Sequence, residues 1–334
     1  IYNRIKRESF MGIYSEIIGC GSYLPSKVVT NEELASMVDT SDEWITSRSG
    51  IKRRHFAAED EFTSDLAIEA ANRAVRNAGI DSKDIDIIIV GTTTPDDTFP
   101  ATAVGVQRAL GISTGAAFDI QAACSGFIFA LSIADSMIKS GQASTALVIG
   151  ADTLSKLLDW EDRSTCVLFG DGAGAVVLKG CENSGNSMVS SILSSHLHTD
   201  GNFRDILYCD NNLGSSEQRR IIVMEGKEVF RHAVNNLAAV VKEALEANQL
   251  EASQIDWLVP HQANKRIIDS TARKLGMGTD RIVLTISEHA NTSAASIPLA
   301  LDSAIRDGRI KKGHLLLMEA MGGGLTWGAA LVRW

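Results

Sequence analysis

Short apolar runs alternate with amphipathic stretches along most of this chain. Runs rich in Ile, Val, Leu and Ala predict buried strands at 85–90, 117–120, 146–149, 175–178, 257–259, 282–284 and 315–318. Between the runs, apolar residues recur at helical spacing, which predicts helices over 64–78, 124–140, 228–248, 264–275 and 293–306. Strands that alternate with helices are typical of an α/β fold with a mostly buried sheet.

An internal repeat divides the chain into two related halves. Residues 77–91 match 247–261, and residues 124–135 match 291–302, at offsets of 170 and 167. Any two strand–helix units resemble each other to some degree. Two matches in the same order at nearly one offset nevertheless favour duplication, and two copies make a pair of halves and not a solenoid.

The duplication sets the expected boundaries. We assign 11–184 to an N-terminal half and 185–334 to a C-terminal half, and we expect the halves to interlock as one unit. Residues 1–10 contain no apolar signal-like run and are interpreted as an upstream extension or an expression remnant. Cys124 and Asn291 are aligned in the second match, so both are expected to approach the pseudo-twofold axis between the halves.

Composition narrows the class of protein. The 334 residues are 45% hydrophobic and 22% charged, which excludes a disordered chain. The net charge of −9 argues against a nucleic-acid partner, and no apolar run is long enough for a membrane helix. Five cysteines without metal-ligand spacing predict neither a disulfide framework nor a metal site, so a cytoplasmic location is expected.

Cys124 stands where a predicted strand gives way to a predicted helix. The helix dipole and the free N–H groups at a helix start favour a thiolate, and small neighbours leave room for a substrate. A buried, inert thiol is the alternative interpretation. The other four cysteines lack this setting and are interpreted as structural or incidental: Cys20, Cys166, Cys181 and Cys209.

Two further polar residues occupy positions where a catalytic role is expected. His261 comes after a strand that Pro260 ends, at the edge where α/β proteins place ligands, although a hydrogen-bonded loop histidine would look the same. Asn291 fits a helix N-cap and, beside a histidine, could also donate hydrogen bonds to an oxyanion. The duplication suggests that Cys124, His261 and Asn291 converge.

Two glycine-rich segments precede predicted strands. Phe169–Gly174 is followed by a strand and not by a helix, so it does not match a phosphate-binding loop. The segment 319–328 contains three consecutive glycines, which allow backbone N–H groups to face a ligand closely, as in an oxyanion hole. A plain tight turn is the alternative.

Several ordered motifs together resemble the thiolase-like condensing enzymes, and most closely the 3-oxoacyl-[acyl-carrier-protein] synthase III family. The resemblance spans about residues 13–334. Its motifs are 19–25, 39–45, 48–51, 122–126, 169–174, 259–264, 291–295 and 322–324. It implies a homodimer of duplicated α/β subunits. Each would have five layers (αβαβα), with two mixed sheets related by a pseudo-twofold axis.

The resemblance also implies the initiating condensation of type II fatty acid synthesis. Cys124 would take an acyl group, expected to be acetyl, from acyl-CoA, with the backbone N–H groups of Cys124 and Gly323 as the oxyanion hole. His261 and Asn291 would stabilise the enolate formed when malonyl-ACP loses CO2. That carbanion would attack acyl-Cys124 to give 3-oxoacyl-ACP. No cofactor beyond the thioester substrates is implied.

Binding residues are also implied by the resemblance. Trp44, Arg48 and Arg163 would line the CoA entrance, Asn264 would hold the phosphopantetheine arm, and Phe99 would reach the partner subunit's acyl pocket. Spacing on the helix near 264–275 indicates a basic patch suited to an acidic carrier protein. That patch comprises Arg231, Arg266, Arg273 and Lys274. Solvated surface charges are the alternative for both sets.

Two positions depart from the family pattern. Ala290 stands where glycine is usual, and Met321 where phenylalanine is common. Both could alter the pocket, but neither removes a catalytic group. A secondary-metabolite condensing relative and a cysteine thioester hydrolase remain alternatives. A thiolase would need a second cysteine, and an elongating synthase a second histidine in place of Asn291.

Overall fold

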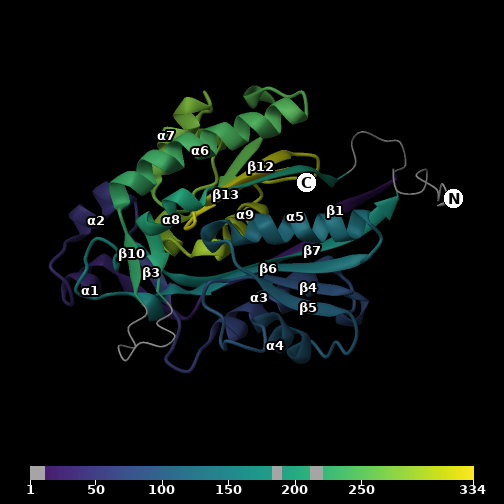
Figure 1. Ribbon diagram of the computed structural model, residues 1–334, viewed down its shortest axis with the longest axis horizontal. Helices are drawn as coiled ribbons and strands as arrows, with labels where there is room; N and C mark the ends of the chain where they lie inside the picture. The colour runs from purple at the N-terminus through teal and green to yellow at the C-terminus, as the bar shows by residue number, and fades with distance from the viewer. Residues whose placement is uncertain (1–11, 183–189, 211–220) are drawn as a thin grey trace.

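The computed structural model describes residues 12–182, 190–210 and 221–334. Two sheets are separated by the helices α5 and α9, and each sheet is covered on its outer face by a further pair, α3 with α4 and α6 with α7 (Figure 1). The expected five layers are therefore confirmed. Residues 1–10, interpreted as an extension, lie outside the described residues, as does the expected boundary between 184 and 185.

The first sheet has five strands in the order β1-β7-β6-β4-β5. β5, β4 and β6 are parallel to one another. β7 pairs antiparallel with β6, and β1 pairs antiparallel with β7. The bounds are β1 (Ile13–Tyr23), β4 (Ile87–Gly91), β5 (Ala116–Ile120), β6 (Thr145–Thr153) and β7 (Asp171–Glu182). Every residue of β4 and β6 is buried, as expected for strands covered by helices on both faces.

The second sheet has the order β11-β12-β13-β8. The strand bounds are β8 (Ser191–Thr199), β11 (Trp257–Pro260), β12 (Leu315–Gly322) and β13 (Thr326–Arg333). The predicted strand at 282–284 is wrong. This segment forms only an isolated parallel bridge, Leu258 with Ile282, in the position that β5 occupies in the first sheet.

The helices pack as their sequence patterns predict. Their bounds are α3 (Thr63–Ala78), α4 (Thr102–Ala109), α5 (Gly126–Lys139), α6 (Gly226–Ala247), α7 (Lys265–Lys274) and α9 (Ser296–Arg306). The outer helix α3 buries one alanine-rich face. The central helix α5 buries Phe127, Ile128 and Leu131 completely, because sheets lie on both sides of it. Truncation of such a buried phenylalanine typically costs about 3–5 kcal/mol.

Several elements of the two halves that surround the site are related by one offset. β11 and β12 begin 170 residues after β4 and β6, and α9 begins 170 residues after α5. The 3₁₀ turns η2 (Ala123–Ser125) and η7 (Ser293–Ala295) repeat the same offset, and each opens with a residue of positive φ, 46° and 50°. The equivalent of Cys124 is therefore Ala294, so the expected pairing of Cys124 with Asn291 is wrong by three residues.

Smaller elements gather at one end of the molecule (Figure 1). They are β2 (Lys27–Thr30), α1 (Asn31–Ala35), α2 (Asp42–Ser49), β3 (Arg53–Phe56), β9 (Leu207–Cys209), β10 (Ile222–Met224) and α8 (Ile286–His289). Arg54 of β3 is fully buried and donates hydrogen bonds to the Asn31 side chain (2.7 Å) and the Val167 carbonyl (2.8 Å). This guanidinium fastens the end elements to the segment that enters β7.

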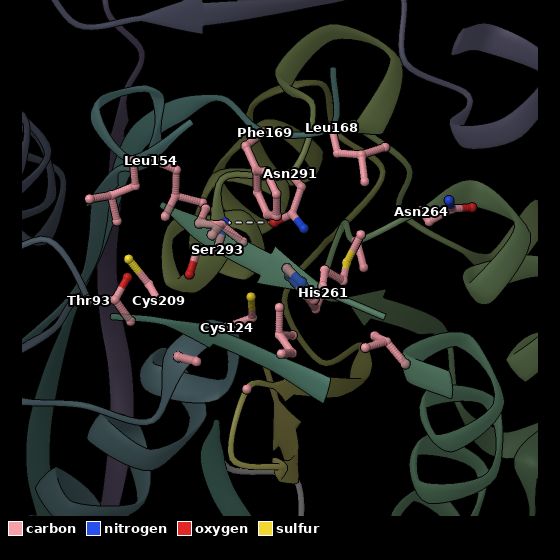
Figure 2. A pocket seen from close by; sticks show the side chains of 18 of the residues that line it. Thr93, Cys124, Leu154, Leu168, Phe169, Cys209, His261, Asn264, Asn291 and Ser293 are labelled. Carbon is pink, nitrogen blue, oxygen red and sulfur yellow. Dashed lines mark hydrogen bonds between the residues drawn. The ribbon is translucent and has the colours of Figure 1, made fainter. Parts of the chain in front are cut away.

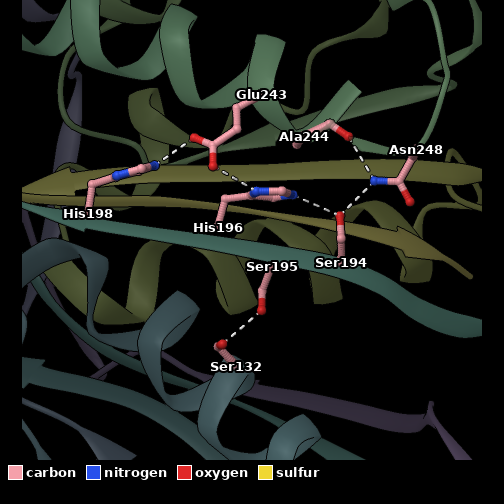
Figure 3. A network of polar contacts seen from close by, with 8 residues as sticks. All are labelled: Ser132, Ser194, Ser195, His196, His198, Glu243, Ala244 and Asn248. Carbon is pink, nitrogen blue, oxygen red and sulfur yellow. Dashed lines mark hydrogen bonds and ion pairs between the residues drawn. The ribbon is translucent and has the colours of Figure 1, made fainter. Parts of the chain in front are cut away.

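A polar network ties α6 to the edge strand β8 (Figure 3). Both carboxylate oxygens of Glu243 are used, one by His196 Nδ1 (3.0 Å) and one by His198 Nε2 (2.6 Å). Ser194 extends the network to Asn248 at the end of α6, which donates to the serine hydroxyl at 2.7 Å.

None of the described helices is long and apolar enough to cross a bilayer.

Candidate active site

One cavity of about 1520 Å³ contains the three predicted catalytic side chains. Cys124, His261 and Asn291 all line it, and Figure 2 shows them facing the same space. The first comes from the N-terminal half and the other two from the C-terminal half. The cavity therefore lies between the halves, as the duplication predicts.

Cys124 lies in the turn η2 and not in a helix, since α5 begins only at Gly126. Burial raises the pKa of its thiol to about 12, although hydrogen bonding with Ser293 opposes that rise. The thiolate expected from the helix dipole is therefore not the resting form. The sequence argument included the dipole but not the desolvation, which depends on residues far away in the chain.

Two consecutive glycines make close main-chain contacts, Gly322 with Cys124 and Gly323 with Leu207. A Cβ added to Gly322 would lie 2.5 Å from the Cys124 nitrogen, and one added to Gly323 would lie 2.7 Å from the Leu207 carbonyl oxygen. Only glycine fits either position without a shift of the backbone. Cys124 and Gly323 both line the cavity, and the pairing of their N–H groups as an oxyanion hole stays a prediction.

His261 follows β11 and is 5% exposed. Burial lowers the pKa of its imidazole to about 3, so the ring is neutral at physiological pH. Its Nδ1 atom lies 2.6 Å from the Ser296 hydroxyl, which accepts a hydrogen bond from the Gln262 N–H (3.3 Å). Because the serine oxygen already accepts that bond, its own proton is available for Nδ1. A serine that donates to Nδ1 leaves the proton of the neutral imidazole on Nε2, the tautomer that a donor role toward a substrate requires.

Asn291 is held by its side-chain oxygen. Oδ1 accepts a hydrogen bond from the Ser293 N–H at 2.9 Å, and the main chain of Asn291 pairs with Leu168 and Gly170. The amide nitrogen is thereby turned toward the cavity, as Figure 2 shows. The expected N-cap role of Asn291 is wrong, because Thr292 is the N-cap of η7 and Ala295 that of α9. The oxygen instead closes a turn with Ser293, and the amide nitrogen is the atom left for the expected donor role.

The predicted CoA residues form one cluster. The guanidinium carbon of Arg48 lies 4.4 Å from the Trp44 ring centre, and that of Arg163 lies 5.3 Å from it. Arg163 also donates to the Asp39 carbonyl oxygen at 2.6 Å. Trp44 and Arg48 line the cavity, so the indole and one guanidinium lie at its wall, whereas Arg163 reaches Trp44 from outside the lining.

The remaining predicted residues lie around the cavity or on the surface. Asn264 caps α7 and lines the cavity, and so does Arg266, which is exposed on the same helix together with Arg273 and Lys274. Arg231 is exposed on the neighbouring helix α6, where it forms an ion pair with Glu228. Phe99 is 84% exposed and does not line the cavity of its own chain.

Sequence reasoning missed four residues near the reaction centre: Asp152, Ser293, Ser296 and Glu319. Glu319 lines the cavity and is 1% exposed, and burial raises its pKa to about 8. A lone acid in the apolar strand 315–322 was the signal for it. Ser293 and Ser296 belong to the polar run that follows Asn291, and that run was the sequence signal for them. Cys209, interpreted as incidental, also lines the cavity.

Comparisons with known proteins agree with these motifs. Residues 118–201 match the family described as 3-Oxoacyl-[acyl-carrier-protein (ACP)] synthase III, and residues 245–334 match its C-terminal part. A beta-ketoacyl-[acyl-carrier-protein] synthase III of Paramagnetospirillum magneticum is 64% identical over 97% of this chain and all of its own length.

Solved structures show the same architecture. The 3-oxoacyl-[acyl-carrier-protein] synthase III of Aquifex aeolicus is 49% identical, with a TM-score of 0.90 over 96% of this chain and all of its own. The priming beta-ketosynthase of the R1128 polyketide pathway is 36% identical, with a TM-score of 0.89 and 96% of each chain covered.

Proposed function

Because the chain belongs to the 3-oxoacyl-[acyl-carrier-protein] synthase III family, we propose that it catalyses the initiating condensation of type II fatty acid synthesis. An acyl group, acetyl in the simplest case, passes from acyl-CoA to Cys124 and is then condensed with malonyl-ACP. The observation that carries this proposal is the convergence of Cys124, His261 and Asn291 on one cavity. No dissociable cofactor is needed for either step.

The first step is acyl transfer. The Cys124 sulfur attacks the thioester carbonyl, the carbonyl oxygen becomes an oxyanion, and the bond to the CoA sulfur breaks. The N–H groups of Cys124 and Gly323 would receive the oxyanion, and the glycines beside them supply the close approach. Covalent catalysis divides the condensation into two easier steps.

The second step is decarboxylative condensation. The malonyl C–C bond breaks, CO2 leaves, and the electron pair forms an enolate on the thioester. Nε2 of the neutral His261 and the amide nitrogen of Asn291 are both donors, so they stabilise the enolate oxygen without a strong base. The enolate carbon attacks acyl-Cys124, and the released thiolate takes up a proton.

Substrate binding is proposed for the surrounding residues. The adenine ring of CoA would stack on Trp44 between Arg48 and Arg163, and Asn264 would contact the pantetheine arm. The acidic carrier protein would dock on Arg231, Arg266, Arg273 and Lys274, which are exposed on adjacent helices.

We also propose a homodimer located in the cytoplasm. β5 is an edge strand whose residues are exposed or half-buried, so its open edge could continue into the sheet of a second copy. Phe99 precedes α4, which packs against β5, and an exposed phenylalanine beside such an edge suits a partner's pocket.

Intact-protein mass spectrometry tests the function. Incubation with acetyl-CoA should add one acetyl group, which Cys124→Ala should abolish, and malonyl-ACP should then discharge it with release of CO2. Absence of an adduct with every acyl-CoA tried, including branched and longer ones, would overturn the proposal. An adduct that water discharges equally well without malonyl-ACP would identify a thioester hydrolase instead.

A further inference from the structure

The face of β12 that lies under the outer helices carries one carboxyl group. Side chains alternate along a strand, and Met318 and Ala320 belong to the apolar core between the two sheets. Glu319 therefore points to the opposite face, which α6 and α7 cover (Figure 1). The next residue on that face, Met321, belongs to one apolar cluster with Leu237 of α6, and all three of these side chains line the cavity. The cavity thus extends beneath the outer helices, and Glu319 forms part of its wall there.

Glu319 is buried without a partner from the chain. Its Oε2 atom has no hydrogen-bond partner among the described residues. The buried carboxyl groups of Asp152, Asp171 and Asp302 differ, because each accepts two or more hydrogen bonds. Burial also raises the pKa of Glu319 to about 8, so the group carries an O–H donor at pH 7. A buried polar group that the chain leaves unpaired is available to a ligand that enters the cavity.

The fold itself does not require an acid at this position. β6 and β12 begin 170 residues apart, so Ile149 is the equivalent of Glu319 in the N-terminal half. Ile149 is fully buried in the apolar core that β6 forms with α3, and it does not line the cavity. An apolar side chain therefore fills the same place in the other half. This difference links the carboxyl group to the cavity and not to the packing of the sheet.

The neighbours of Glu319 indicate which part of a substrate it meets. The main-chain N–H of His261 donates to the Glu319 carbonyl oxygen at 2.8 Å, so the two residues are adjacent where β11 pairs with β12. In the proposed reaction, His261 receives the carbonyl oxygen of the malonyl thioester. In a pantetheine thioester, only two carbons separate the sulfur from the nearest amide group. That amide therefore enters the part of the cavity that Glu319 lines.

An amide group in this part of the cavity also needs a partner. Of the residues of α6, α7 and β12 that line the cavity, only Lys227, Arg266 and Glu319 are polar, and the first two are exposed. Asn264, just before α7, already uses its side-chain oxygen to accept from the Arg266 N–H at 2.8 Å, which leaves its amide nitrogen for another part of the arm. Glu319 is therefore the buried polar side chain that these three elements offer to the amide.

We propose that Glu319 binds the pantetheine amide nearest the thioester and donates its O–H to the amide carbonyl oxygen. Each of these two groups would otherwise be unpaired in a dry site, so the hydrogen bond removes both penalties. CoA and the carrier protein present the same arm, so the bond forms in both steps of the reaction. Glu319 contacts the substrate but not the reacting atoms, and it thereby positions the thioester beside His261 and Cys124.

This hydrogen bond rests on the proposed function, and truncated substrates test it with a matched pair of variants. Glu319→Gln keeps a neutral N–H donor, whereas Glu319→Met has a similar length and no donor. The acetyl thioester of N-acetylcysteamine contains the amide, and that of pentanethiol does not. In Glu319→Met, acylation of Cys124 by the first thioester should slow about 5- to 150-fold, because the amide is left unpaired. Acylation by the second should change little, and Glu319→Gln should react with both like the unmodified protein.

A purely structural role for Glu319 gives a different result. Equal losses of Glu319→Met with both thioesters would mean that the side chain only supports the shape of the cavity, and unchanged rates with both would mean that no contact exists. Either outcome, or an equal loss in Glu319→Gln, would overturn the assignment. Thermal unfolding shows whether Glu319→Met is folded, and Glu319→Leu replaces it if it is not. Failure of the unmodified protein to be acylated by acetyl-CoA would instead contradict the proposed function.

Discussion

The Nδ1 atom of His261 lies 2.6 Å from the hydroxyl oxygen of Ser296, the first residue of α9. In the other half the equivalent positions are Gly91 and Gly126, and they pack so closely that a Cβ on Gly91 would lie 2.7 Å from the Gly126 carbonyl carbon. Only one half therefore has room for a histidine and its orienting serine. This contact decides which imidazole nitrogen faces the substrate.

Ser296→Ala removes the group that fixes the tautomer of His261. Decarboxylation of malonyl-ACP should fall about tenfold, because one hydrogen bond contributes up to about 1.5 kcal/mol. Acylation of Cys124 should change little, since His261 has no part in it. The two rates are followed separately, as CO2 release and as adduct mass. Ser132→Ala, which removes a hydroxyl bonded to Ser195 far from the cavity, is the control.

Asn291→Ala and Asn291→Asp separate the two atoms of the side chain. The aspartate keeps an oxygen for the Ser293 N–H but lacks the amide donor. Both variants should keep Cys124 acylation and lose about 10²–10³ in decarboxylation, the usual effect of removing one oxyanion donor. Retention of decarboxylation in Asn291→Asp would contradict the donor role.

Gly322→Ala should abolish acylation of Cys124. The new methyl group would lie 2.5 Å from the Cys124 nitrogen, so the main chain must shift where the oxyanion forms. The measurement is adduct formation with acetyl-CoA, together with thermal unfolding to show that the variant is folded. Gly201→Ala, where no atom lies within 4 Å of the added Cβ, should be acylated normally. Normal acylation of Gly322→Ala would rule out an oxyanion site at this N–H.

Trp44→Ala should raise the KM for acetyl-CoA about 5- to 150-fold with little change in kcat, because stacking of a base on an aromatic ring contributes about 1–3 kcal/mol. A truncated acetyl thioester that lacks the nucleotide provides the control. Its kcat/KM should be the same for Trp44→Ala and the unmodified protein. An equal loss with both substrates would mean that Trp44 supports the fold of the entrance and does not bind adenine.

Glu319 should make stability depend on pH. Burial raises its pKa to about 8, whereas in the unfolded chain it titrates near its ordinary value of about 4.3. Between these values the folded protein holds a proton that the unfolded chain has lost, so stability falls as pH rises through this window. Glu319→Gln should lose less stability over the same range. Thermal unfolding from pH 5 to pH 8 checks this, and parallel curves for the two proteins would contradict it.

The sequence by itself determined the elements and the reacting residues. The alternation of apolar runs and amphipathic stretches is local, so it located all the sheet strands that it predicted except 282–284. A strand end before Pro260, a small-residue turn at Cys124 and a polar run at Asn291 are equally local. The side chains that these signals mark, Cys124, His261 and Asn291, all line the cavity.

Only the tertiary structure decided how those residues work. The equivalence of Cys124 with Ala294 follows from strand and turn positions, which a gapped match cannot fix to within three residues. The protonated Cys124 and the neutral His261 result from burial by both halves, and desolvation depends on atoms that are distant in sequence. The partner of His261, Ser296, is set by a contact between segments 35 residues apart, which no local pattern encodes.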